Sequence, residues 1–433
     1  MQEDADQHRE TEVAPALIAV HPAQQSIAVA VGSDLRVFNL HEGYPAKLVD
    51  DSEEHNANTN VHKHSIRAIR YGAKGNLFVS AGDDKLVKIW KTDSWRCTST
   101  VLSEKRVSAV AISNDGLYVC FADKFGVVYV VDVEELSKQS STNKKGVPIL
   151  AHYCSIITRL EFSPDGRFII SADRDFKIRV TVFPRNPLNG THEIQSFCLG
   201  HTEFVSSLAF VRSLDHPQAF LVSGGGDSTV RLWDFTTGCL LDTCAVGEHE
   251  GFLQSNGKED ESSLPAVTDV CTSHDGSLVA VAIQSLAGIM LLSCNLSAKT
   301  LSIIKVISVS EENFIPTSIG SSSTERLLWM VMGASSLNSS DSTCVARVRV
   351  LSGFSGSNME SVEHETLILD DKDVPGGEVT LEKLQGSLLI EKQAFNAAAE
   401  AVKTAMRNLL IKKQYTEERR EYRKRGRNDK KTI

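Results

Sequence analysis

Two groups of residues have side chains or backbones that could do chemistry. Gly224, Gly225 and Gly226 form a glycine triplet of the kind that can approach a phosphate, and His62 and His64 stand two residues apart. The triplet is followed by Asp-Ser-Thr rather than by a dinucleotide or phosphate-binding sequence. No serine-hydrolase, metalloprotease or zinc-deaminase signature occurs in the sequence. We therefore expect no catalytic residue, no metal site and no cofactor held by this chain.

A third group is a dense cluster of charges between Ser171 and Val182. Its members are Asp173, Arg174, Asp175, Lys177 and Arg179. If a turn leads into a strand here, alternation places Lys177 and Arg179 on one face. The other face then carries the apolar residues Phe176, Ile178 and Val180. Such an edge can dock another protein, because guanidinium pairs bidentately with carboxylates. The alternative is a solvated strand whose charges pair within the chain.

A repeat predicts the elements that position these residues. In its two clearest copies a histidine precedes an apolar strand, and a serine and an aspartate precede a tryptophan by ten and six residues. The copies are His64, Ser80, Asp84 and Trp90, and then His201, Ser223, Asp227 and Trp233. This spacing is typical of WD-repeat propeller blades, in which such a set ties the strands of one blade by buried hydrogen bonds. We therefore assign these residues a structural role.

The blade that carries the charge cluster departs from this pattern. Ser171 and Asp175 occupy the serine and aspartate positions, but Thr181 stands where the tryptophan is expected. This blade therefore lacks the tryptophan of its internal hydrogen-bonded set. Its charged turn and strand are left as its distinguishing feature.

Weaker copies complete the chain. Apolar strands joined by Ser-Asn-Asp-Gly, Ser-Pro-Asp-Gly and Ser-His-Asp-Gly turns give seven units in all, near the roughly 40–45 residues expected for each blade. The sequence thus predicts an all-β fold, a seven-bladed WD-repeat β-propeller over 15–352. We expect a disordered acidic N-terminus over 1–14 and a connector over 353–387. An amphipathic α-helix and basic tail should follow over 388–433.

Charge is distributed unevenly along the chain. The 433 residues have a formal net charge of −9, whereas residues 412–433 contain ten Lys or Arg and four acids. A basic tail on an acidic body favours contact with a polyanion or an import receptor. The candidate residues are Lys412, Lys413, Arg419, Arg420, Arg423, Lys424, Arg425 and Arg427. The alternative is a solvated helix end.

The cysteines and the hydropathy pattern bear on the compartment. Nine cysteines without a C-x-x-C pair are typical of buried free thiols in a reducing compartment. The polar, acidic start is not a secretory signal, and no apolar run is long enough to span a membrane.

Two segments together resemble a known family. Ala172–Val180 and Phe197–Ser206 are similar to the WD-repeat, non-catalytic subunit of the eukaryotic tRNA (guanine-N7-)-methyltransferase. Phe176 departs from the resemblance, because an acidic residue is common there in the family. An ion pair made at that position in other members is therefore not expected here.

The resemblance implies a function. The chain would be a non-catalytic scaffold that forms a heterodimer with a catalytic subunit and acts in the nucleus. That partner would bind S-adenosylmethionine and methylate N7 of a guanine in the tRNA variable loop. Lys177 and Arg179 would meet carboxylates of the partner, and Asp173, Arg174 and Asp175 would meet its cations or shape the turn.

Other functions of propellers remain open. One is a substrate receptor of a cullin-type ubiquitin ligase, although the Trp-Asp-x-Arg sequence of such receptors is missing at Trp233. Another is a ribosome-assembly scaffold, which suits a basic tail. An independent enzyme is the least favoured alternative.

Overall fold

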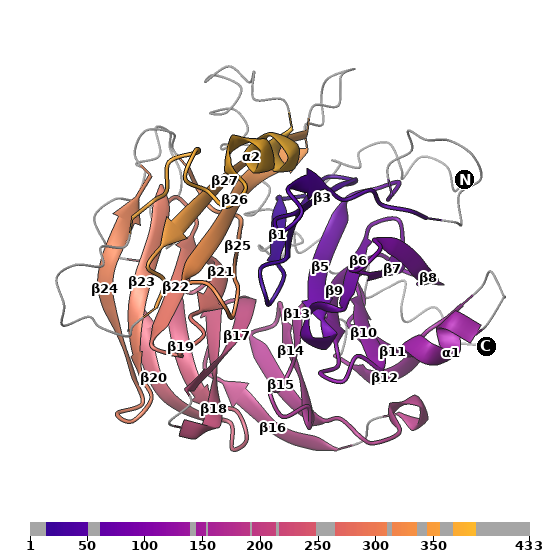
Figure 1. Ribbon diagram of the computed structural model, residues 1–433. Helices are drawn as coiled ribbons and strands as arrows, with labels where there is room; N and C mark the ends of the chain where they lie inside the picture. The colour runs from indigo at the N-terminus through magenta and orange to yellow at the C-terminus, as the bar shows by residue number, and fades with distance from the viewer. Residues whose placement is uncertain are drawn as a thin grey trace, which may run out of the picture.

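Seven small antiparallel sheets are arranged around one axis, as Figure 1 shows for this computed structural model. The structure describes residues 14–50, 61–138, 144–152, 155–190, 193–213, 216–247, 265–309, 314–335, 344–355 and 367–386. The predicted β-propeller fold is confirmed. The N-terminal residues 1–13 and the predicted helix and tail over 388–433 lie outside the described residues.

Each sheet is one blade, and the blades follow one another along the chain. The strands are, for blade 1, β1 Leu17–Val20, β2 Ser26–Val31, β3 Asp34–Asn39 and β4 Tyr44–Pro45; for blade 2, β5 Ile66–Gly72, β6 Leu77–Gly82, β7 Leu86–Lys91 and β8 Arg96–Leu102; for blade 3, β9 Val107–Ile112, β10 Tyr118–Asp123, β11 Val127–Asp132 and β12 Val147–Ala151; for blade 4, β13 Ile157–Phe162, β14 Phe168–Asp173, β15 Lys177–Val182 and β16 Ile194–Leu199. The remaining strands are, for blade 5, β17 Val205–Ser213, β18 His216–Gly225, β19 Thr229–Asp234 and β20 Cys239–Ala245; for blade 6, β21 Val267–Thr272, β22 Leu278–Ile283, β23 Gly288–Asn295 and β24 Thr300–Ser308; and for blade 7, β25 Ser318–Ser321, β26 Leu327–Ser335 and β27 Cys344–Ser352.

The four-residue turn signals form the expected connections between first and second strands. In the Ser163–Gly166 turn the Ser163 hydroxyl donates to Asp165 Oδ1 at 2.5 Å and accepts from the Phe168 amide at 3.0 Å. Gly166 closes the turn with a φ of 71°, a left-handed conformation that glycine adopts at little cost. The same serine–aspartate bond recurs in blades 3 and 6.

The core lies between blades rather than within them. Each blade is a single sheet, so its two faces bury apolar side chains against the neighbouring blades. Ile178 and Val180, for example, pack with Trp233 and Leu208 of blade 5. The tryptophans Trp90, Trp233 and Trp329 are fully buried.

The hydrogen-bonded histidine sets form within blades 2 and 5. His201 Nε2 lies 2.7 Å from Ser223 Oγ and its Nδ1 lies 3.0 Å from Asp227, while Trp233 Nε1 donates to Ser223 at 2.8 Å. In blade 2, Trp90 likewise donates to Ser80 at 3.1 Å. The predicted histidine of blade 2 is wrong, however. His62, not His64, contacts Asp84 at 2.7 Å and Ser80 at 2.8 Å.

The reason for this difference is where the two imidazoles point. His62 is fully buried beneath the turn, whereas His64 lies two residues closer to β5 and is exposed. Two histidines at this spacing cannot be told apart from the sequence pattern alone. The structure assigns the buried one to the set.

Ring closure uses the segment that the sequence treats as a connector. Among the described residues blade 7 has three strands, and its outer strand β27 pairs briefly with residues 367–369, where the Leu369 amide donates to the Val350 carbonyl at 2.8 Å. Helix α2 (Gly377–Gln385) then covers the junction of blades 7 and 1 (Figure 1). Leu381 and Leu384 are buried in the cluster that also contains Phe38 and Trp329. Residues 367–386, which the sequence predicts as part of a connector, therefore fold against blades 7 and 1.

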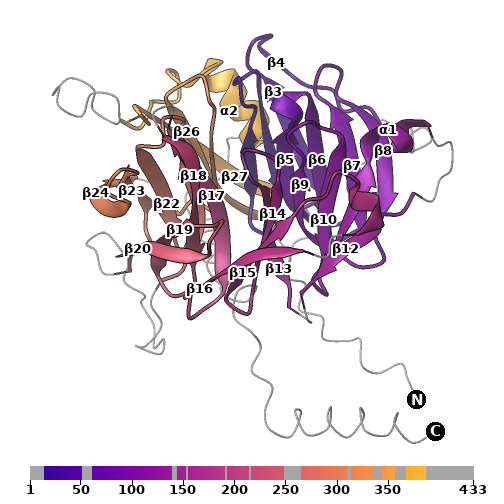
Figure 2. The same cartoon turned by 90° about the horizontal axis from the view of Figure 1, so that it is seen from below.

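Figure 2 shows the ring from below, with α2 beside β3 and β27. Arg36 of blade 1 donates to the Leu384 carbonyl at 3.2 Å, and Gln385 Oε1 accepts from the Val348 amide of blade 7 at 2.8 Å. The helix thus joins the first and last blades by polar as well as apolar contacts. Within the part of the chain that the structure describes, no helix is long and apolar enough to cross a membrane.

Candidate docking surface on blade 4

Blade 4 carries the charged cluster on its third strand and the turn before it. In Figure 1, β13 lies nearest the axis and β16 lies at the rim. Asp173 Oδ1 accepts from the Asp175 amide at 2.9 Å and from the Lys177 amide at 3.0 Å, which fixes the turn. Phe176, the residue directly before β15, has a φ of 72°. The turn therefore sets where β15 starts and which face Lys177 and Arg179 occupy.

Of the two roles predicted for Asp173, the structure shows the shaping of the turn and leaves the carboxylate too buried to meet a partner's cation. Asp173 is 1% exposed, and its Oδ2 lies 2.7 Å from Nδ1 of His152, a histidine that the sequence pattern missed. His152 Nε2 lies 2.7 Å from Ser171 Oγ. Burial alone would raise the pKa of the Asp173 carboxyl, but the His152 and backbone hydrogen bonds outweigh it and lower the pKa. Asp173, not Asp175, is thus the aspartate of the blade 4 set.

Thr181 confirms that this set is incomplete. It lies buried where blades 2 and 5 have tryptophan, and its hydroxyl has no hydrogen-bond partner in the structure. The Ser171 hydroxyl consequently bonds His152 without the indole donor that Ser80 and Ser223 receive.

Arg179 is the cation that distinguishes blade 4. Its Nη1 donates to the Ala151 carbonyl of blade 3 at 2.9 Å, and its guanidinium carbon lies 5.6 Å from the centre of the Phe197 ring. Burial lowers the pKa of the guanidinium, and attraction to Asp173 opposes this only in part. Among the residues that the structure describes, no carboxylate forms an ion pair with Arg179.

The same strand position in other blades shows what is unusual here. The third residue of the third strand is Arg36 in blade 1, Lys88 in blade 2 and Arg231 in blade 5. Arg36 pairs with Asp34 at 2.7 Å, the buried Lys88 pairs with Asp50, and Arg231 lies 3.6 Å from Asp227. A carboxylate of the same chain therefore neutralises this cation in three blades. In blade 4 the half-buried cation contacts a carbonyl and a ring, is attracted in part by the buried Asp173, and forms no ion pair among the described residues.

The remaining predicted residues surround Arg179. Lys177 is exposed and lies on the same face of β15, directly opposite Leu199 of β16. Arg174 and Asp175 are half-buried in the turn and interact within the chain. Of the five residues predicted to contact a partner, Lys177 and Arg179 thus present their charges on one surface.

Sequence reasoning missed the apolar part of this surface. Phe176, Phe197 and Leu199 are 38%, 39% and 60% exposed. Phe197 is paired with Arg179 in the strand register, and Leu199 with Lys177. The signal was present, since Phe197 and Leu199 fall in the second resembling segment, but the register between β15 and β16 was needed to place them beside the cations. Phe176 was expected on the buried face and instead lies exposed at the turn.

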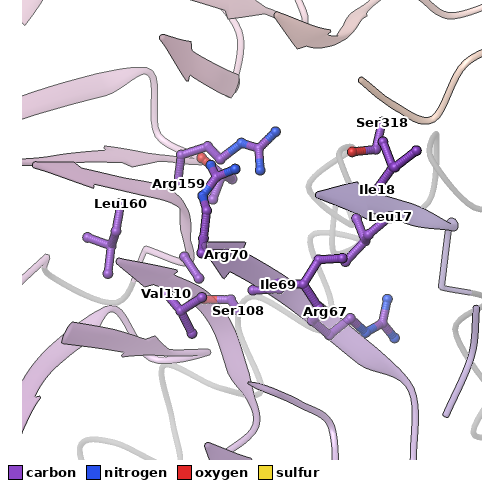
Figure 3. A pocket seen from close by; sticks show the side chains of 13 residues that line it. Leu17, Ile18, Arg67, Ile69, Arg70, Ser108, Val110, Arg159, Leu160 and Ser318 are labelled. Carbon is purple, nitrogen blue, oxygen red and sulfur yellow. The ribbon is translucent and has the colours of Figure 1, made fainter. Parts of the chain in front are cut away.

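A second candidate site lies on the axis. Arg67, Arg70 and Arg159 line a cavity of about 30 Å³ together with hydroxyls of Ser108, Thr158 and Ser318 (Figure 3). This volume is enough for about one water molecule. The cavity is therefore too small for a nucleotide or for S-adenosylmethionine.

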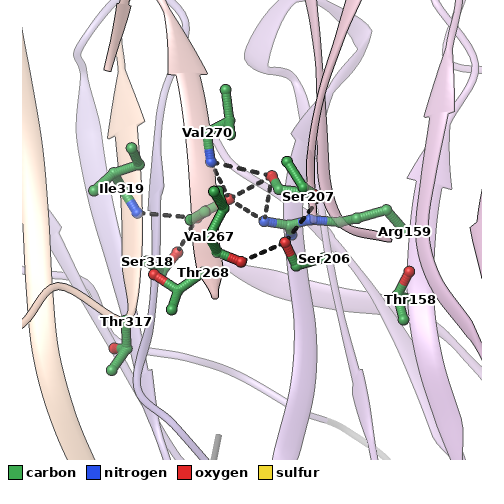
Figure 4. A network of polar contacts seen from close by, with 12 residues as sticks. Thr158, Arg159, Ser206, Ser207, Val267, Thr268, Val270, Thr317, Ser318 and Ile319 are labelled. Atoms are coloured by element: carbon green, nitrogen blue, oxygen red, sulfur yellow. Dashed lines mark hydrogen bonds and ion pairs between the residues drawn. The ribbon is translucent and has the colours of Figure 1, made fainter. Parts of the chain in front are cut away.

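Ion pairs cross the axis at this point. Arg159 of blade 4 pairs with Asp269 of blade 6, and Arg70 of blade 2 pairs with Glu161 of blade 4. Asp269 also accepts from Ser207 at 2.8 Å, from Ser318 at 3.1 Å and from the Ile319 amide at 3.0 Å (Figure 4). Burial would raise the pKa of Asp269, but Arg159 and these donors outweigh it and lower the pKa. The axial residues thus have a structural role, because they join blades 2, 4, 5, 6 and 7. The rim of blade 4 remains the candidate docking site.

Sheet order, turn chemistry and the histidine sets define a WD-repeat β-propeller. The chain belongs to the family described as the tRNA methyltransferase TRM82 WD40 domain, whose model matches residues 21–151 and 137–344.

Relatives with curated names agree with this family. The chain is 38% identical over 232 residues to the tRNA (guanine-N(7)-)-methyltransferase non-catalytic subunit wdr4 of Danio rerio, covering 52% of this chain and 50% of that protein. It is 36% identical over 180 residues to the subunit WDR4 of Homo sapiens, covering 42% and 40%. The chain spans about half the length of these curated relatives.

Solved structures agree on the fold. The structure titled U3-55K has a TM-score of 0.56 at 18% identity and covers 74% of this chain and 89% of its own. The WD40 repeats of RRP9 have a TM-score of 0.55 at 19% identity, covering 74% and 88%. At these identities the likeness shows a propeller and nothing more.

Proposed function

We propose that this chain is the non-catalytic scaffold subunit of a heterodimeric tRNA (guanine-N7-)-methyltransferase. The observation that carries the proposal is Arg179, a half-buried cation without an ion-pair partner among the described residues. Its equivalents in three other blades are neutralised within the chain. A carboxylate of a second protein would complete the pair, and the names of the relatives supply the kind of protein.

The chemistry explains why a scaffold would matter. N7 of guanine is a neutral and weak nucleophile, so methyl transfer depends mainly on holding donor and acceptor in line. The catalytic partner would bind S-adenosylmethionine and the target guanine. Arg179 and Lys177 would fix one segment of that partner, and the axial ion pairs and interblade core would keep their platform rigid. In this proposal the chain has no catalytic residue of its own.

Two further parts of the proposal concern the basic tail and the compartment. We place the complex in the nucleus and assign contact with tRNA phosphates to the tail residues between Lys412 and Arg427. These residues lie outside the described part of the chain. Deletion of 412–433 should weaken tRNA binding by the complex at low salt and leave the heterodimer intact. Unchanged tRNA affinity at the same salt would remove this assignment.

The function itself is tested by reconstitution. The catalytic subunit of the same organism is assayed with transcribed tRNA and S-adenosylmethionine, alone and with the full chain present. We expect methylation at N7 of guanine to require both chains, and N7-methylguanosine to be absent from tRNA of cells that lack this chain. Methylation by the catalytic subunit alone at the full rate would contradict the proposal, as would methylation by this chain alone.

A further inference from the structure

One turn of blade 4 combines two features that are unfavourable in a free chain. The residue directly before the third strand has a left-handed backbone in four blades, with φ values of 67°, 84°, 72° and 56°. These residues are Lys85, Gly126, Phe176 and Ser228. A bulky aromatic side chain is disfavoured in this conformation, where glycine and asparagine are preferred. Blade 4 alone among the four places a large apolar residue there.

Phe176 is not buried in compensation. Its side chain is 38% exposed at the tip of the turn. A residue that is strained in its backbone and partly hydrated in its ring stabilises the free chain poorly. Strain of this kind is found where surrounding structure or a binding partner makes use of it.

Two more exposed apolar side chains lie on β16, opposite Lys177 and Arg179, the first and third residues after Phe176. Leu199 lies opposite Lys177 in the register of β15 and β16, and Phe197 lies opposite Arg179 and beneath its guanidinium. Directly opposed residues of antiparallel strands have neighbouring side chains. We call Phe176, Phe197 and Leu199 the apolar rim of blade 4. It is continuous with the two cations proposed to meet the catalytic subunit.

We propose that the apolar rim supplies apolar contact, and with it part of the affinity for the partner subunit, beside the ion pair of Arg179. This inference rests on the proposed function. The partner would present a shallow apolar surface that takes the Phe176 ring and Leu199, and beside it a carboxylate that reaches Arg179. Interfaces commonly combine a desolvated aromatic anchor with a flanking arginine pair. An acidic residue at this turn would contribute a charge to the interface. Phe176 would contribute apolar contact in its place.

The chemistry favours a protein over a nucleic acid on this rim. Leu199 offers no aromatic face for a base to stack on, and stacking platforms for single strands rely on aromatic side chains in a basic groove. The half-buried Asp175 also lies in the turn that carries Phe176, whereas Asp173 is buried against His152. A phosphate backbone on this turn would approach the Asp175 carboxylate, whereas an apolar protein surface need not.

Blade 2 offers matched controls for the test. Lys85 occupies the turn position of Phe176 with a φ of 67°, and it is exposed. Leu102 ends the outer strand of blade 2 as Leu199 ends that of blade 4, and it is 41% exposed. The test pair is therefore Phe176→Gly and Leu199→Gln, and the control pair is Lys85→Gly and Leu102→Gln.

The full chain and its four variants are titrated with the catalytic subunit by calorimetry, at about 0.1 M and about 0.5 M salt. We expect Kd to rise at least about tenfold for Phe176→Gly and for Leu199→Gln, at both salt concentrations, because apolar contact is little screened. The control variants should stay within about twofold of the unmodified chain. Phe176→Gly should melt no lower than the unmodified chain, since glycine relieves the backbone strain.

Three outcomes overturn the inference. Equal Kd values for test and control variants would do so while leaving the proposed function standing, provided Arg179→Glu still abolishes binding. A homodimer of the unmodified chain that Phe176→Gly dissociates, with partner binding unchanged, would assign the rim to a second copy. Weakened tRNA binding with unchanged heterodimer affinity would assign it to nucleic acid. Failure of the unmodified chain to bind the catalytic subunit would contradict the proposed function itself.

Discussion

At the scale of residues, blade 4 differs from its neighbours at one strand position. Arg179 lacks the carboxylate that Lys88 finds in Asp50 and Arg231 finds in Asp227. A half-buried cation that forms no ion pair is costly in a free chain, and a partner carboxylate removes part of that cost. The strain at Phe176 in the preceding turn adds to the same conclusion. Both residues are better suited to a complex than to an isolated propeller.

The histidine assignment leads to the first prediction. His62→Ala should lower the free energy of unfolding by about 2 kcal/mol, because it removes the buried imidazole that is hydrogen-bonded to both Ser80 and Asp84. His64→Ala, at an exposed site, should change it by less than about 0.5 kcal/mol. Urea denaturation of the two variants checks this. The reverse order of effects would restore His64 to the set.

Asp227 gives a prediction about pH. Burial would raise its pKa, but His201 and the neighbouring hydrogen bonds lower it from 3.8 to about 2. Because the folded-state pKa is depressed, its contribution to stability is present above about pH 4 and is lost as the pH falls toward 2. The stability difference between the unmodified chain and Asp227→Asn should therefore shrink as the pH is lowered from about 5 to about 3, measured by urea denaturation at each pH. A difference that grows on acidification would contradict this assignment.

Individual residues were predictable only where spacing leaves one choice. Ser80, Ser223, Trp90 and Trp233 follow from the ten-residue interval and lie where it predicts. The interval assigned Asp175 to the set of blade 4, and this prediction is wrong, because Asp173 in the same tight turn meets His152. The choice between the two carboxylates depends on which amides the turn directs at Asp173, and these directions are set only when the turn has folded.

At the scale of elements, helix α2 takes over the closure of the ring. Within the described residues blade 7 has three strands, and α2 covers its junction with blade 1. Leu384→Ala should destabilise the chain by about 3 kcal/mol, because Leu384 is fully buried between the two blades. Val379→Ala on the same helix, where Val379 is 51% exposed, should cost less than about 0.5 kcal/mol. Equal losses of stability for the two variants, in thermal or chemical unfolding, would show that α2 does not stabilise the closure of the ring.

The sequence predicts strands better than this helix, for a physical reason. Strands of a propeller repeat at a fixed interval and are bounded by turns such as Ser163–Gly166, so each copy supports the others. Helix α2 has nine residues, and its buried residues Leu381 and Leu384 acquire a partner surface only when blades 1 and 7 meet. No local pattern carries that information. The segment therefore resembled a connector.

At the scale of the whole molecule, charges that cross the axis hold the platform together. Asp269→Ala should cost about 3–5 kcal/mol of stability, because it leaves Arg159 without its counter-charge and Ser207 and Ser318 without their acceptor. The double variant Asp269→Leu with Arg159→Met should recover most of this loss, since neither charge remains. Chemical denaturation of both variants decides between this account and one in which the axial pair is dispensable.

The central claim is that a carboxylate of the catalytic subunit completes the charge of Arg179. The most direct test measures heterodimer affinity for Arg179→Glu, and then for the same variant with each candidate partner carboxylate reversed to arginine. We predict that Arg179→Glu weakens heterodimer binding at least about a hundredfold. Reversal of one carboxylate of the catalytic subunit to arginine should then restore most of the affinity. The rate of N7-methylation of tRNA should fall and recover with the affinity. Lys91→Glu, an exposed cation at the end of β7, should leave binding unchanged. Unaltered affinity of Arg179→Glu for the catalytic subunit would contradict the account.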